Sequence, residues 1–163
     1  MIFNGKMNTE NRPDPESRLT HFQGQLFWVL LAIVVLALQL FILWPFLRGK
    51  FPETTLNWIY FISRLFVFLG LGYVFGVHLG LKRVRVFASI MFVGFVDQVV
   101  MKWIFTRQDM ALHPEAWKDI PFAGSPFNLL FGLTQGFLYF LPILMILAFF
   151  GMEFGKFLRK TRP

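Results

Sequence analysis

Long apolar stretches separated by short polar segments make up most of the chain. From Leu26 to Leu47 every residue is apolar except Gln39. A helix of this length crosses a hydrocarbon core of about 30 Å. Three further stretches of similar length follow, at residues 56–81, 86–105 and 127–150. The pattern therefore predicts four membrane-spanning helices.

The segments around the predicted spans are polar. Residues 1–25 are expected to form a cytoplasmic arm, residues 106–126 an outer loop, and residues 156–163 a basic cytoplasmic tail. Within the outer loop, Pro114 to Ile120 are expected to form one or two helical turns. The predicted organisation is one membrane domain over residues 26–155 with polar segments at both ends.

Composition agrees with this organisation. Of the 163 residues, 56% are hydrophobic and only 15% are charged. The mean hydropathy of +0.57 is too high for an ordinary soluble domain. Four spans in a chain of this length also leave no room for a separate soluble enzyme domain. The chain has no cysteine, which excludes disulfides, thiolate metal ligands and cysteine nucleophiles.

The positive charges are distributed unequally between the two predicted sides of the membrane. Ten lie on one side: Lys6, Arg12, Arg18, Lys82, Arg83, Arg85, Lys156, Arg159, Lys160 and Arg162. Four lie on the other: Arg48, Lys50, Arg107 and Lys118. Because cytoplasmic segments of membrane proteins are enriched in Lys and Arg, both termini are expected to be cytoplasmic.

These observations predict the fold class, which is an all-α integral membrane protein forming a four-helix transmembrane bundle. The charge asymmetry is typical of a bacterial inner (plasma) membrane protein. The expected partner is the lipid bilayer, with other membrane subunits or a homo-oligomer as further possibilities. The net charge of +7 is explained by this topology, so no nucleic-acid partner is expected.

The polar residues inside the spans fall at one depth. With a rise of about 1.5 Å per residue, Gln39, Arg64, Asp97 and Gln135 each lie about 10 to 12 Å from the outer end of their span. Polar groups are costly in hydrocarbon, so these side chains are expected to face the bundle interior as a buried layer that also includes Gln98. Arg64 is predicted to pair with Asp97 across adjacent helices.

Lys102 is close to this layer in sequence. At about 100° per residue, its side chain lies about 140° around the helix from Asp97. It is therefore expected to reach the outer membrane surface with its ammonium group and to stay outside the polar layer.

Two interpretations of the layer remain open. It is either a hydrogen-bonded contact that sets the helix register, or an active site in which Asp97 titrates or Arg64 holds an anionic substrate. The first favours a non-enzymatic assembly or transport-accessory subunit without catalytic residues. The second favours an ion-coupled small transporter or an outer-face lipid or lipopeptide hydrolase.

Glycines at four-residue spacing indicate close helix packing, because small residues let two backbones approach. They form one series in the second span and one pair in the fourth: Gly72, Gly76, Gly80, Gly132 and Gly136. Packing within the chain is the favoured interpretation, and oligomerisation is the alternative.

Other polar residues give weaker signals. His78 is the one histidine within the predicted spans, and a haem or pigment ligand is a less favoured interpretation than a polar group at the interface. Asp109, His113 and Glu115 could ligate a metal, but a solvated loop is the favoured interpretation. No cofactor and no metal site are predicted.

Asp97, Gln98 and Lys102 form a local pattern that continues into the following loop with Pro121, Phe122, Phe127, Asn128 and Leu129. The pattern resembles part of the lipoprotein signal peptidases, which are four-helix membrane aspartyl proteases with an Asp-Gln-x-x-Lys sequence. Here the lysine comes one residue later, the segment belongs to the third span, and no second intramembrane aspartate completes a catalytic pair. We therefore assign no family from this resemblance.

Overall fold

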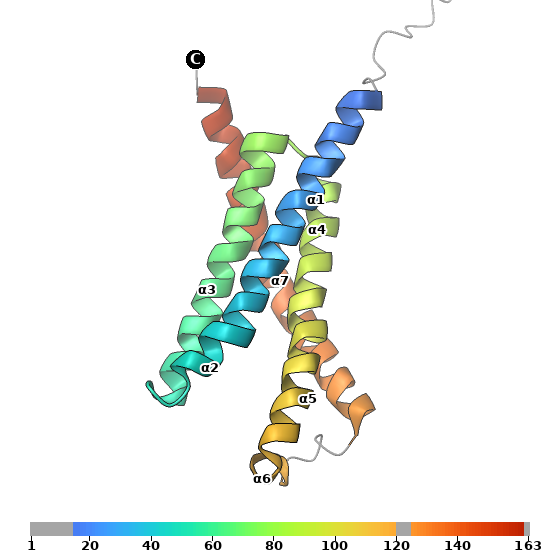
Figure 1. The fold of residues 1–163 in the computed structure, drawn as a ribbon. Coiled ribbons are helices and arrows are strands. Elements are labelled where there is room, and N and C mark those ends of the chain that lie inside the picture. Colours follow the sequence, from blue (N-terminus) through green and yellow to red (C-terminus); the bar gives the residue numbers. More distant parts are fainter. Residues whose placement is uncertain (1–14, 120–124, 162–163) are drawn as a thin grey trace, which may run out of the picture.

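The computed structural model describes residues 15–119 and 125–161. Within these residues the chain is helical and contains no strand. Four long helical segments run antiparallel, so that the start of the first and the end of the last lie at the same end of the bundle (Figure 1).

The first two segments each contain a π-helical turn, in which the backbone is wider than in an α-helix. The first consists of α1 (Pro15–Leu38), the π-turn η1 (Gln39–Leu43) and α2 (Trp44–Leu47). The second consists of α3 (Glu53–Val74) and the π-turn η2 (Phe75–Leu79).

The third segment also contains a π-turn, and the fourth is a single helix. The third consists of α4 (Arg83–Phe95), η3 (Val96–Met101) and α5 (Lys102–Leu112). The short helix α6 (Pro114–Trp117) and then α7 (Pro126–Thr161) complete the chain.

All four segments are long and apolar enough to cross a membrane, as predicted. Their helices are longer than the predicted spans, because hydropathy locates the apolar part of a helix and not its polar ends. The helix is already formed at Pro15, within the predicted arm, and α7 continues to Thr161, within the predicted tail. Residues 106–112, assigned to the outer loop, belong to α5. The predicted turn after Pro114 is present as α6.

Predictions for residues 1–14, 120–124 and 162–163 lie outside the described residues. This applies to the first part of the arm, to residues near the end of the outer loop and to the last residues of the tail.

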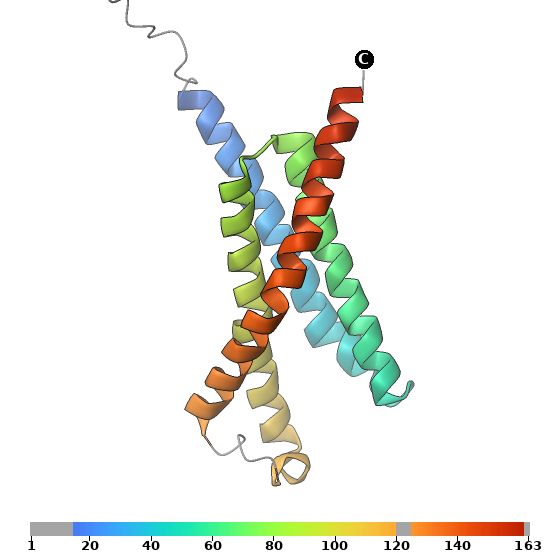
Figure 2. The ribbon, with the colours of Figure 1, turned by 180° about the vertical axis from the view of Figure 1, so that it is seen from behind.

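The core lies where the four segments face one another. It includes side chains from all of them that are completely shielded: Leu36, Phe68, Phe75, Ile90, Ala148 and Met152. Seen from behind, α7 crosses the bundle diagonally and packs on both α3 and α4 (Figure 2). The α7 helix therefore joins the second and third segments.

Two glycines of the second segment, Gly72 of α3 and Gly76 of η2, lie directly against the backbone of α7. A Cβ at Gly72 would overlap the carbonyl group of Ala148, and one at Gly76 would overlap that of Met152. The absence of a side chain at both positions lets the two backbones touch.

The contact is reciprocal, because two glycines of α7 lie against the backbone of α3. A Cβ at Gly151 would overlap the carbonyl of Leu69, and one at Gly155 would lie 2.6 Å from the carbonyl oxygen of Tyr73. The sequence analysis overlooked this pair, although Gly151 and Gly155 have the same four-residue spacing. Their position among charged residues near the end of the chain hid the signal.

The other glycines singled out from the sequence do not pack helices together within the chain. No atom of the described residues lies within 4 Å of a Cβ built at Gly132 or Gly136, so they make no close helix contact within the chain, and the oligomerisation alternative stays a prediction. Gly80 has a positive φ of 54° and follows the end of η2. It ends the helix, because glycine adopts this backbone conformation without steric cost, and is not part of the α3–α7 contact.

The substitution Gly72→Ala is expected to lower the free energy of unfolding by about 1 to 3 kcal/mol, because the new methyl group meets backbone that cannot rotate away. The matched control is Gly70→Ala on the same helix, where no atom lies within 4 Å of the added Cβ. The control should leave stability unchanged or raise it by up to about 1 kcal/mol through better helix propensity. Thermal unfolding in detergent measures both, and equal effects would contradict the proposed contact.

Candidate functional site

Arg64 of α3 and Asp97 of η3 form an ion pair inside the bundle. The Nη2 atom of Arg64 donates a hydrogen bond of 2.6 Å to Oδ1 of Asp97. The two side chains are only 5% and 0% exposed. This contact confirms the predicted pairing, and it removes the large cost of leaving either charge alone in an apolar interior.

Gln98 is a second hydrogen-bond partner of the Asp97 carboxylate. Its Nε2 atom donates a 2.6 Å hydrogen bond to Oδ2 of Asp97. Both carboxylate oxygens therefore accept a hydrogen bond from a buried neighbour, as buried polar groups generally require. We call Arg64, Asp97 and Gln98 the clasp.

Tyr60 lies one helical turn before Arg64 and supports its guanidinium group. The guanidinium carbon lies 3.5 Å from the centre of the Tyr60 ring, a cation–π arrangement. Two buried atoms here have no hydrogen-bond partner among the described residues, the Tyr60 hydroxyl and Nε of Arg64. Buried donors without partners are uncommon in native proteins and call for an explanation.

Lys102 is the first residue of α5, directly after the π-turn η3. It follows Gln98 by four residues, a spacing that puts two side chains on one face of a helix. Lys102 is partly buried and lines one cavity with Arg64 and Gln98. The prediction that it stays outside the polar group is therefore wrong, because it considered the angle to Asp97 and not the face shared with Gln98.

This cavity, which we call the clasp cavity, has a volume of about 220 Å³ and lies between α3, the third segment and α7. Its polar lining consists of Asn57, Tyr60, Arg64, Gln98 and Lys102. A volume of this size exceeds that of a single water, which occupies about 30 Å³ in the liquid. The clasp cavity therefore has room for a group larger than water.

The apolar lining of the clasp cavity comes from two helices, α3 and α7. The residues are Phe61, Leu65, Phe140 and Leu144. The rings of Phe61 and Phe140 are in contact, with centroids 5.8 Å apart. Phe140 is 37% exposed, so the apolar wall continues to the outer surface of the bundle.

The two remaining glutamines of the predicted layer do not join the clasp. Gln39 is half-buried, and its Oε1 atom accepts a 3.3 Å hydrogen bond from the hydroxyl of Ser63. Gln135 is exposed on α7, so its placement in a buried layer is wrong. Among the described residues of α7, Phe137 is the first that is buried. The helix diverges from α3 before that point (Figure 2).

A second cavity of about 470 Å³ lies at the end of the bundle opposite the termini. Arg48 and Asp109, both in its lining, form an ion pair of 2.8 Å, and Trp117 donates a 3.0 Å hydrogen bond to the other oxygen of Asp109. Sequence reasoning missed this pair because it assigned Asp109 to a loop. The described residues contain no group of three side chains able to hold a metal, so Asp109 and His113 are not joined by a third ligand.

His78 is exposed near the end of η2. Its ring stacks on that of Trp28, with centroids 6.4 Å apart. The ring thus lies at the surface of the bundle, and the described residues contain no group of three metal-ligating side chains that includes it.

Comparison of the chain with protein-family models, with curated proteins and with solved structures found no match. The arguments on function consequently rest on the residues of this chain and their geometry.

Proposed function

We propose that the chain is an integral membrane protein of a bacterial inner membrane, with both termini in the cytoplasm. The support is physical. Large apolar side chains such as Phe66, Ile146 and Phe150 point outward from the middle of the helices. A continuous exposed apolar surface of this kind is unfavourable in water and favourable in lipid.

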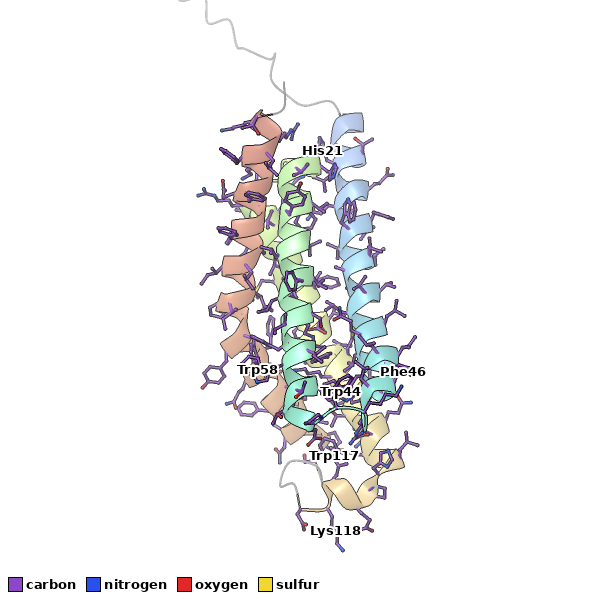
Figure 3. The ribbon with its side chains drawn as sticks, turned by 90° about the vertical axis from the view of Figure 1, so that its left-hand side faces the viewer. His21, Trp44, Phe46, Trp58, Trp117 and Lys118 are labelled. Carbon is purple, nitrogen blue, oxygen red and sulfur yellow. The ribbon has the colours of Figure 1, made fainter. Side chains whose placement is uncertain are left out.

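Two further features support this orientation. The end that holds both described termini also holds the basic connection from Lys82 to Arg85. Figure 3 shows Trp44, Trp58 and Trp117 toward the opposite end, where indole rings suit a membrane interface.

Within the membrane, we propose that the chain acts as a non-enzymatic subunit that assists the assembly or transport function of a larger complex. The observation that carries this proposal is the clasp, in which both oxygens of Asp97 are already occupied. A carboxylate that acts as a base, nucleophile or proton carrier needs an oxygen available to the reacting group. The geometry therefore favours a structural role for Asp97, holding α3 against η3.

The competing proposal is an active intramembrane site, either for ion-coupled transport or for hydrolysis at the outer face. The observation that favours it is the clasp cavity, which is lined by Lys102 and by Arg64, the partner of Asp97. Such activity would require the ion pair to open, so that Asp97 could exchange a proton or contact a substrate.

The two proposals differ in how Asp97 and Arg64 affect stability. Asp97→Asn and Arg64→Gln should each lower the free energy of unfolding by about 3 kcal/mol, because each leaves the other charge buried and unpaired. The double variant should recover part of this loss, which a double-mutant cycle in detergent would show.

The Arg48 and Asp109 pair is the matched control for this cycle. Arg48 is 44% exposed, so removing either partner should cost about 1 kcal/mol or less. If the clasp double variant were no more stable than the sum of its single variants predicts, the structural proposal would be wrong.

The proposed orientation can be tested directly because the chain has no cysteine. In intact bacterial cells, a membrane-impermeant maleimide should label Lys118→Cys and leave Arg159→Cys unlabelled until the membrane is permeabilised. Both side chains are exposed, so labelling reports the side of the membrane. The reverse pattern would overturn the orientation, and labelling of both before permeabilisation would overturn the assignment of the termini.

A further inference from the structure

The clasp cavity contains more positive charge than the clasp neutralises. Arg64 pairs with Asp97, whose second oxygen is taken by Gln98. Lys102 lines the same cavity and forms no ion pair among the described residues. Two cations therefore line the cavity, and only one of them is paired with a carboxylate, which leaves an excess positive charge there.

The same place contains donors without acceptors. Nε of Arg64 and the hydroxyl of Tyr60 are buried and have no hydrogen-bond partner among the described residues, and both residues line the cavity. Arg64 is 4% exposed, so ordinary solvent does not satisfy it. A group that accepts hydrogen bonds and carries negative charge would satisfy both the charge and the donors.

The opposite wall of the cavity is apolar and reaches the lipid-facing surface. Phe61 and Leu65 of α3 and Phe140 and Leu144 of α7 form this wall. The first turns of α7 lie beside α5 and diverge from α3 (Figures 1 and 2). An apolar chain could thus lie along the wall while a polar head reaches the cations from within the membrane.

We propose that the clasp cavity binds an anionic amphiphile, with its phosphate or carboxylate head against Lys102, Arg64 and Tyr60 and its apolar chain along Phe61 and Phe140. The cavity volume of about 220 Å³ matches a head group with the first part of a chain and is too small for a whole lipid. This proposal rests on membrane insertion and not on the assembly role.

Titration calorimetry of the full chain in a non-ionic maltoside detergent tests the proposal, with dodecyl phosphate as the probe. We expect one saturable site. Lys102→Gln should weaken its affinity about tenfold, as expected for loss of one charge-assisted hydrogen bond. Lys102→Arg should retain most of the affinity. Lys118→Gln, which removes an exposed cation outside the cavity, is the matched control and should bind like the parent chain.

Two further ligands separate the head group from the chain. Inorganic phosphate should bind far more weakly than dodecyl phosphate, and equal binding would show a site for a free anion and overturn the amphiphile. Dodecylphosphocholine, which has the same chain and no net charge, should also bind weakly. Equal binding of this ligand, or unchanged binding by Lys102→Gln, would overturn the proposed role of the cations.

Tyr60→Phe keeps the test decisive if Lys102→Gln does not fold. This variant removes only a buried hydroxyl without a partner, so stability of the ligand-free protein should stay the same or rise. Its affinity for dodecyl phosphate should fall about fivefold, the effect of one neutral hydrogen bond. Lower stability with unchanged affinity would show that the hydroxyl serves the fold and overturn its assignment to the ligand.

These outcomes are independent of the stability cycle for Arg64 and Asp97. If the double-mutant cycle showed no coupling between Arg64 and Asp97, the structural proposal would be wrong and the binding data would still stand. If dodecyl phosphate did not bind, the proposed amphiphile site would be wrong and the structural role of the clasp would still stand.

Discussion

The positive charge of Arg64 in an apolar bundle is the constraint on which the rest of the structure depends. A buried guanidinium without a counter-charge is costly in an apolar interior. Asp97 supplies the charge and the ring of Tyr60 supports the flat face of the group. Gln98 then occupies the oxygen that Arg64 leaves free. Helices α3 and α4–α5 are thereby held in one register at this level.

The close contact between α3 and α7 determines where a cavity can form beside Arg64. The backbones touch along Gly72 and Gly76 on one side and Gly151 and Gly155 on the other. Beyond this contact α7 turns toward α5, and large side chains such as Phe140 separate it from α3. The clasp cavity lies in this wider part between α3 and α7. The two helices are thus in tight contact near the glycines and leave a cavity nearer the start of α7.

Lys102 adds a second cation to the clasp cavity. It follows Gln98 by four residues, so both side chains lie on one face of the third segment. We therefore propose different roles for two residues of the third segment. Asp97 stabilises the fold, and Lys102 binds an anion. One carboxylate is occupied by the protein, and one ammonium group remains available to a ligand.

The sequence by itself determined the four apolar segments, their antiparallel order and the pairing of Arg64 with Asp97. Each follows from a cost that acts locally, either apolar area in water or an unpaired charge in an apolar surrounding. Only the tertiary structure decided that Gln135 is exposed, that Gly151 and Gly155 replace Gly132 and Gly136 in the contact, and that Lys102 lines the cavity. These features depend on the path of α7 and on how the third segment faces α3. Both are set by packing between segments distant in sequence, which periodicity along a single helix does not contain.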